Sequence, residues 1–340
     1  MLRFVTTRLA TTLVQLAGLA LVVFFAIRAL PADPVARLVG LNASQDAYLS
    51  SKRALGLDRP VLEQLGAYLG VLPGSSGLLQ GDFGRSWVTG SPVAEEIRRV
   101  LPITLELITI SFVLAFFIAV PLGMLCALRP GGTADRITFG YSLFAGSQPE
   151  FWWALLFIFV FFATLGWAPP PLGRLDPMTR PPPMITGFIT FDTLMAGDLK
   201  TFRDALHHLA LPVLTKVFVL SGPIIKMVRQ NMVRVLASDY ILYARGSGLR
   251  PGRIAWMALK NALAPAMTLL GVLYGYILGS AVLIETVFSL GGIGQYAVRS
   301  VLAFDYPAIQ AVVLVIAAIS LFVYLALDVA HALIDPRIVT

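Results

Sequence analysis

The chain has very little charge for its length. Only 13% of its 340 residues are Asp, Glu, Lys or Arg, whereas about 25% is typical of soluble globular domains. Hydrophobic residues make up 57% of the chain, and its mean hydropathy is +0.79. Because so few polar groups cannot cover the surface of a soluble fold, this composition predicts a protein that crosses a membrane several times.

Cysteine and histidine are also scarce, which excludes two kinds of site. The single cysteine, Cys126, lies inside an apolar segment, so neither a disulfide framework nor a cysteine metal cluster is available. His207 and His208 are adjacent, and neighbouring residues on a helix point about 100° apart. No acidic or cysteine cluster accompanies them. We therefore expect a structural role for both histidines and no metal site.

Motifs for catalysis and nucleotide binding are missing as well. The sequence has no GxxxxGK[ST] phosphate loop, no HExxH helix and no GxSxG elbow. We expect no enzymatic activity and no cofactor on this chain alone. The net charge of +7 does not indicate nucleic acid, since the basic residues flank apolar segments and form no basic face with interleaved aromatics.

Six apolar segments are long enough to cross a hydrocarbon core, which requires about 20 residues. They are predicted at residues 9–30, 103–128, 137–167, 208–228, 264–288 and 307–333. The first apolar run is too long for a signal-peptide core of 7 to 15 residues, so we expect an uncleaved helix. The predicted fold class is an all-α integral membrane protein with six transmembrane helices.

The positive charges near the segment ends predict the orientation. Placing the N-terminus in the cytoplasm assigns twelve basic residues to that side: Arg3, Arg8, Arg129, Arg136, Lys226, Arg229, Arg234, Arg245, Arg250, Arg253, Lys260 and Arg337. Short loops rich in Lys and Arg are retained in the cytoplasm, whereas long loops translocate largely regardless of charge. Both termini are therefore expected in the cytoplasm.

This topology divides the chain into three parts. Residues 1–30 form the N-terminus and first helix, 31–102 an extracytoplasmic insert, and 103–340 a five-helix core that contains a cytoplasmic loop at 229–263. Within the insert, helical patterns are predicted around Ala47–Leu55 and Val61–Leu72, with LGLDRP between them as a turn. A second outer stretch, at about 168–205, is rich in proline and favours extended or turn structure.

The stretch from Ser238 to Pro265 combines basic residues, glycines and helix-compatible sequence between two membrane-length runs. Its charge favours the cytoplasmic side, and its composition favours folded helices over a linker. We interpret it as a docking surface for a partner protein, with Gly248 as a turn between two short helices. Anchoring to anionic lipid is the alternative.

Two ionisable residues inside the apolar segments are candidates for a transport pathway. Lys216 lies well within the fourth segment, where a charge normally faces a bundle interior, a partner carboxylate or water. Glu285 lies nearer the end of its segment, where capping or pairing is the favoured interpretation. For Lys216, a pathway role and a structural ion pair remain equally open.

Short motifs in a fixed order run through the whole chain. They are ADPV at Ala32, LGLDRPV at Leu55, GDFGRSW at Gly81, PVAEEI at Pro92, TLEL at Thr104, HLALP at His208, ETVFSLGGIGQY at Glu285 and DYP at Asp305. Together they resemble the first permease subunit of bacterial oligopeptide/dipeptide-type ABC importers. The resemblance implies a pore-forming subunit in the inner membrane, with ATP and Mg bound by partner ATPases.

The same resemblance assigns the docking surface to the EAA-type segment that contacts the ATPase. The matching positions are Asp239, Tyr240, Ala244, Arg245, Gly248, Leu249, Asn261, Ala262 and Pro265, and Arg250 and Arg253 are expected to pair with ATPase carboxylates. Leu242 stands where the wider motif has glutamate, and Tyr243 and Gly246 replace alanines. The extra glycine weakens the helix by up to about 1 kcal/mol relative to alanine.

The implied partners are a second homologous permease, two ATPase subunits, an extracytoplasmic solute-binding protein and membrane lipid. Peptides are the expected cargo. Nickel chelates, glutathione, opines and oligosaccharides remain alternatives with the same architecture. A secondary transporter or a membrane enzyme is a distant alternative, because inverted repeats, midplane coupling carboxylates and a catalytic constellation are not seen in the sequence.

Overall fold

The structure is a computed structural model that describes residues 2–31, 33–40, 43–263 and 266–334. Apart from one isolated bridge between Arg85 and Pro92, the regular structure in these ranges is helical. The α-helices are α1 (Leu2–Ala29), α2 (Pro34–Val39), α3 (Gln45–Ala54), α4 (Val61–Leu69), α5 (Val93–Leu128), α6 (Thr133–Gly146), α7 (Glu150–Phe157), α8 (Ile189–Met195), α9 (Leu199–Leu236), α10 (Asp239–Gly246), α11 (Pro251–Leu263), α12 (Ala266–Val287), α13 (Ile293–Leu302) and α14 (Tyr306–Ile334). This confirms the predicted all-α class.

Five of these helices are long and apolar enough to span a membrane by themselves. The spans lie at Val5–Ala29, Val93–Leu128, Leu199–Leu236, Leu269–Val287 and Tyr306–Val329. They match five of the six predicted segments. Two of them are longer than predicted, because α5 already begins at Val93 and α9 extends from Leu199 to Leu236.

The third predicted segment, 137–167, is not one continuous helix. It consists of α6 and α7, and α7 is extended by a π-helical stretch at Ile158–Thr164, with a bend of 99° between the two parts. Proline disfavours helical backbone at the residue before it and has no N–H to donate, so α6 ends before Pro149 and α7 begins after it. The pair counts as a sixth span only if both parts cross the membrane together.

Helices α5 and α9 form the centre of the bundle and pack along most of their length. Their shared core includes Leu107, Ala115, Ile224 and Val228, all fully buried. Gly123 allows the close approach, because a Cβ at this position would lie 2.8 Å from the Cβ of Val228. The core is therefore built around helices that are distant in sequence.

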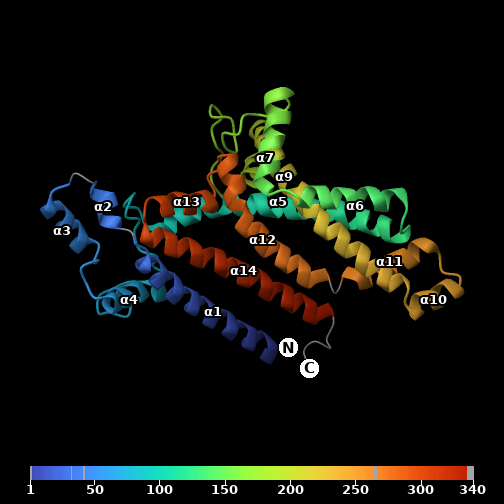
Figure 1. Cartoon of the computed structure of the whole chain (residues 1–340), viewed down its shortest axis with the longest axis horizontal. Helices are drawn as coiled ribbons and strands as arrows, with labels where there is room; N and C mark the ends of the chain where they lie inside the picture. Colours follow the sequence, from blue (N-terminus) through green and yellow to red (C-terminus); the bar gives the residue numbers. More distant parts are fainter. Residues whose placement is uncertain (1, 32, 41–42, 264–265, 335–340) are drawn as a thin grey trace.

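Helices α1 and α14 lie side by side and antiparallel (Figure 1). Arg28 near the end of α1 lies 5.8 Å from the ring centroid of Tyr306 at the start of α14, and Arg8 lies 3.4 Å from Asp328 at the other end. Apolar side chains such as Leu13 and Val14 on α1 are exposed, as expected for a helix surface that faces lipid.

The insert at 31–102 and the loop at 229–263 lie at opposite ends of the bundle (Figure 1). The insert, with α2, α3 and α4, lies at one end together with α13, whereas α10 and α11 lie at the other. The predicted helical patterns of the insert are confirmed as α3 and α4. Glycines with positive φ, Gly56 at +68° and Gly70 at +76°, follow these two helices.

Candidate functional site

A cavity of about 740 Å³ lies along α9 and is also lined by α6, α7 and α12. Its lining on α9 extends from Lys216 to Gln230, which corresponds to about 21 Å at 1.5 Å per residue. This is roughly two thirds of the 30 Å thickness of a hydrocarbon core. Gly222 and Pro223 of α9 belong to the lining, and α6 approaches closely at Gly222, where a Cβ would lie 3.3 Å from Ser142 Cα.

Lys216 lies in the wall of this cavity and is only 1% exposed. Its Nζ lies 3.1 Å from Glu150 Oε1 at the start of α7 and 3.2 Å from Ser280 Oγ on α12. The buried ion pair, one of the two interpretations of Lys216, is thus present, and the role of Lys216 in the pathway stays a prediction. The contact joins three helices at one point of the cavity.

Glu150 is the residue that sequence reasoning missed. Its side chain is buried beside Lys216, and its second oxygen, Oε2, has no hydrogen-bond partner within the part of the chain that the structure describes. A signal was available, since Glu150 is a carboxylate inside the predicted third segment, where ionisable groups indicate function. No local pattern relates Glu150 to Lys216, because the two residues are 66 positions apart.

Glu285 is not among the cavity-lining residues. Its carboxylate accepts hydrogen bonds from the Thr104 hydroxyl of α5 and from the Gln295 backbone N–H at 3.0 Å. Thr104 Oγ1 also accepts from the Ile293 N–H at 2.9 Å, so the first turn of α13 is fixed to α5 and α12. This geometry gives Glu285 a structural contact, and its role in the pathway stays a prediction.

The segment predicted to be a docking surface folds into α10 and α11. They contribute Ile241, Ile254 and Ala258 to the hydrophobic core of the bundle, and Asn261 Nδ2 donates to Tyr240 Oη at 2.8 Å. Gly248 has φ of +77° and lies between the two helices, which confirms the predicted turn. Two residues from the predicted segment thus hold the two helices together, and the whole unit is attached to the core.

The solvent-exposed side chains of α10, α11 and the turn between them include both apolar and basic groups. Leu242, Tyr243 and Trp256 are exposed there. The predicted coupling residues Asp239, Arg245, Arg250 and Arg253 are exposed too, whereas Ala244 is buried and Leu249 half-buried. In the described ranges none of these three arginines has an ion-pair partner. Pro265 lies outside the described residues.

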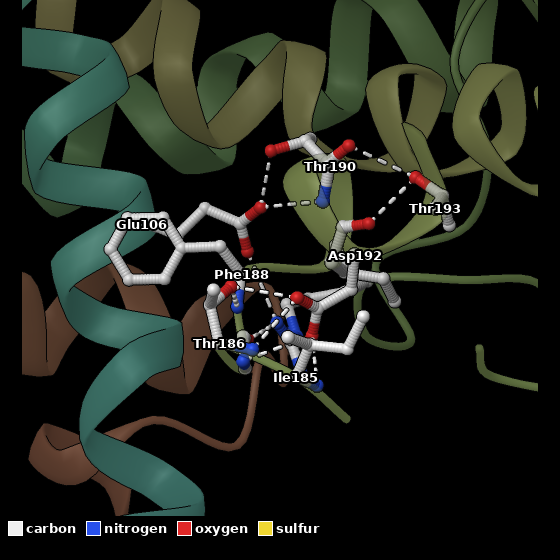
Figure 2. Close-up of polar contacts among 10 residues, drawn as sticks. Glu106, Ile185, Thr186, Phe188, Thr190, Asp192 and Thr193 are labelled. Carbon is white, nitrogen blue, oxygen red and sulfur yellow. Dashed lines mark hydrogen bonds and ion pairs between the residues drawn. The ribbon is translucent and has the colours of Figure 1, made fainter. Parts of the chain in front are cut away.

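The proline-rich outer stretch is anchored to α5 by Glu106, which is completely buried (Figure 2). Glu106 Oε1 accepts from the Thr190 N–H at 2.8 Å and from the Thr190 hydroxyl at 2.6 Å. Its Oε2 lies 3.1 Å from Arg174 Nη1. Burial lowers the pKa of Arg174, and the charge of Glu106 opposes this shift.

Asp192 of α8 organises the same stretch (Figure 2). It accepts backbone N–H groups from Ile185, Thr186 and Gly187 at 3.2, 2.8 and 2.9 Å, and the Thr186 hydroxyl at 2.7 Å. Burial by itself raises the pKa of Asp192, but these hydrogen bonds outweigh it, so that the pKa lies below its usual value. The outer stretch is therefore an ordered element.

Two family descriptions match the chain and together cover most of it. Residues 119–340 match "Binding-protein-dependent transport system inner membrane component", and residues 1–108 match "Binding-prot-dependent transport system membrane comp, N-term".

Several curated relatives are similar over nearly their whole length. The "Probable D,D-dipeptide transport system permease protein DdpB" of Escherichia coli (strain K12) is 39% identical over 95% of this chain and 93% of its own. The "Di/tripeptide transport system permease protein DppB" of Pseudomonas aeruginosa (strain UCBPP-PA14) is 35% identical over 99% of both chains. The "Dipeptide transport system permease protein DppB" of Escherichia coli (strain K12) is 32% identical over 99% of both.

Proposed function

Because the chain belongs to the family of binding-protein-dependent transport system inner membrane components, it is a permease subunit of an ABC importer, and we propose that peptides cross the membrane along its cavity. The family is one of membrane components, so this subunit is not the catalytic one. The observation that carries the proposal is a cavity extending along α9, with a buried charged pair in its wall. Ionisable groups at such depth are typical of substrate pathways.

The names of the relatives make peptides the proposed cargo. They describe transport of dipeptides, di/tripeptides and D,D-dipeptides. These names favour peptides over nickel chelates, glutathione, opines and oligosaccharides, and over ion-driven secondary transport. The cavity volume of about 740 Å³ lies within the range of roughly 300–1,000 Å³ that is usual for small-molecule sites.

A second, homologous permease is proposed to complete the pathway. Several side chains that line the cavity are open to the outside of this chain, among them Phe139 at 63% and Leu143 at 61% exposed. A pathway for polar cargo must be separated from lipid, because unpaired polar groups in hydrocarbon cost several kcal/mol each. A homologous chain facing α6, α9 and α12 would supply the missing wall.

The α10–α11 surface is proposed to be the contact with an ATPase subunit, one for each permease. Leu242, Tyr243 and Trp256 provide the apolar anchors that such interfaces use, and Arg245, Arg250 and Arg253 are available for carboxylates on the partner. Since this unit is joined to α9 and α12, movement of the ATPase can bias the bundle between two states. ATP and Mg are bound by the ATPase subunits in this proposal.

The proposed orientation places both termini and the α10–α11 surface in the cytoplasm. The positive charges favour this choice. Because α1 and α14 are antiparallel, the start of α1 and the end of α14 lie at the same end of the bundle, away from the insert (Figure 1). The insert, α13 and the anchored stretch before α9 then face outward. An extracytoplasmic solute-binding protein is proposed to dock on this outer face.

Reconstitution of the purified assembly tests the proposal. The tagged chain is expected to retain a second permease and ATPase subunits from native membranes, and a peptide-loaded binding protein should stimulate both ATP hydrolysis and peptide uptake in vesicles. Peptide uptake by the isolated chain in response to an ion gradient, without any ATPase, would instead identify a secondary transporter.

A further inference from the structure

The charged pair in the cavity wall has one unused hydrogen-bond acceptor. Glu150 Oε1 is engaged by Lys216, but Oε2 is buried without a partner within the described residues. Lys216 is held on both sides, by Glu150 and by Ser280 Oγ at 3.2 Å. Buried polar atoms in native proteins are nearly always paired, so an unpaired carboxylate oxygen at a cavity requires an explanation.

Stability alone does not explain this pair. Burying two charges costs about as much free energy as their attraction returns, and apolar replacements of buried pairs are often neutral or stabilising. Glu150 is the first residue of α7, but it is not a solvent-exposed cap, since both side chains of the pair are buried in the wall of the cavity. A role toward a molecule inside the cavity accounts for both the charge and the free oxygen.

The other acidic group in the described lining is already occupied. Asp135 accepts Arg229 Nε at 2.5 Å and Nη2 at 2.8 Å, and its Oδ2 also accepts the Gly131 N–H at 2.8 Å. Arg136 and Lys226 line the same end of the cavity as Asp135 and add positive charge there. The positive charge at that end disfavours a cationic ligand group there, and Glu150 is the acidic group of the described lining that keeps an unpaired oxygen.

The geometry points to a subsite in which Glu150 Oε2, which is covered in this structure, is uncovered when a peptide enters the cavity and accepts hydrogen bonds from its amino-terminal ammonium, while Lys216 holds Oε1. A carboxylate oxygen is acceptor-only, so its partner must donate, and a charged donor makes the stronger bond. The amino terminus of a peptide is such a group at neutral pH, since its pKa is about 7.7–8.0. This inference rests on the proposed import of peptides and names the residues that recognise them.

The decisive experiment exchanges the two charges in the full assembly with its second permease, ATPases and binding protein. The variants are Glu150→Gln, the swap Glu150→Lys with Lys216→Glu, and Asp328→Asn as a control, a partly exposed carboxylate of α14 that pairs with Arg8 away from the cavity. Uptake of a labelled dipeptide into vesicles gives kcat/KM, and thermal unfolding of the purified assembly gives its stability.

Glu150→Gln is expected to lower kcat/KM for uptake by about tenfold or more, because a hydrogen bond between two charged groups becomes one to a neutral amide. The swap is expected to have the thermal stability of the unaltered assembly, because the ion pair forms again, but not its peptide uptake, since the free acceptor then lies on α9 instead of α7. The Asp328→Asn control should behave as the unaltered assembly.

A swap that restores both stability and uptake would assign the pair a purely structural role and overturn the inference. Uptake by Glu150→Gln at the rate of the unaltered assembly would do the same, and it decides the matter if the swap does not assemble. Failure of the unaltered assembly to import any peptide would refute the proposed function itself, which is a separate outcome.

Discussion

Substitution of Gly248 by valine should weaken coupling without preventing membrane insertion. Gly248 has φ of +77°, and a Cβ built there meets no heavy atom within 4 Å. The added side chain therefore causes no clash, and its cost is confined to the backbone. For an L-residue with a side chain, left-handed backbone costs about 1–2 kcal/mol, and a β-branched side chain is among the least tolerant.

This cost acts on the turn that sets α10 against α11. A change of 1–2 kcal/mol alters a population by a factor of roughly 5–30. The native turn would then be much less populated, while the membrane helices, which are stabilised elsewhere, remain folded. In the reconstituted assembly we expect peptide-stimulated ATP hydrolysis to fall several-fold, with normal amounts of the chain in the membrane.

Two further glycine substitutions serve as controls for this reasoning. Gly248→Asn should be milder, because asparagine adopts left-handed backbone more readily than valine. Gly252→Ala lies within α11, where φ is not positive and the Cβ position is open, so coupling should be unchanged. Undiminished peptide-stimulated ATP hydrolysis by Gly248→Val in a purified assembly would refute the coupling role of this turn.

Three other outcomes follow from the structure. Glu106→Gln leaves Arg174 without its buried charge partner, which costs about 3–5 kcal/mol of stability, so hydrogen exchange in the stretch before α8 should accelerate. Unchanged protection of these amides would contradict the anchoring role of Glu106. The pKa of Asp192 is lower in the folded than in the unfolded chain, so its contribution to stability is complete above the unfolded value of about 3.9 and is lost as the pH falls through the lower folded pKa. Hydrogen exchange in the stretch before α8 should therefore accelerate only in acid, and acceleration between pH 7 and 5 would count against this. Trp256→Ala should weaken retention of the ATPase by about 2 kcal/mol, or roughly 30-fold, whereas Trp167→Ala, equally exposed at 68% against 66%, should have no effect in the same co-purification assay.

Hydropathy predicted where the chain can cross a membrane, but not the course of every helix. Five predicted segments are continuous helices, whereas 137–167 is broken near Pro149 and bends by 99°. Hydropathy sums transfer free energies over a window and is insensitive to direction, so a bent pair and a straight helix have the same signal. Proline chemistry at Pro149 was the local indication of the break.

The docking helices were predictable because their determinants are local. Basic charge, helix-forming residues and a glycine at 248 lie within one short stretch, and the structure has α10, a left-handed Gly248 and α11 there. The anchoring of the outer stretch was not predicted. Glu106 and Thr190 are 84 positions apart, and no local pattern relates them.

The sequence by itself determined the membrane class, the approximate spans and the family, since composition, apolar run length and the order of short motifs are properties of the linear chain. Only the tertiary structure decided which ionisable groups meet. Lys216 contacts Glu150 in the wall of the cavity, and Glu285 turns instead toward Thr104 and α13. The physical reason is that the direction of a side chain around its helix axis acquires meaning only when neighbouring helices pack, and those neighbours come from distant parts of the chain.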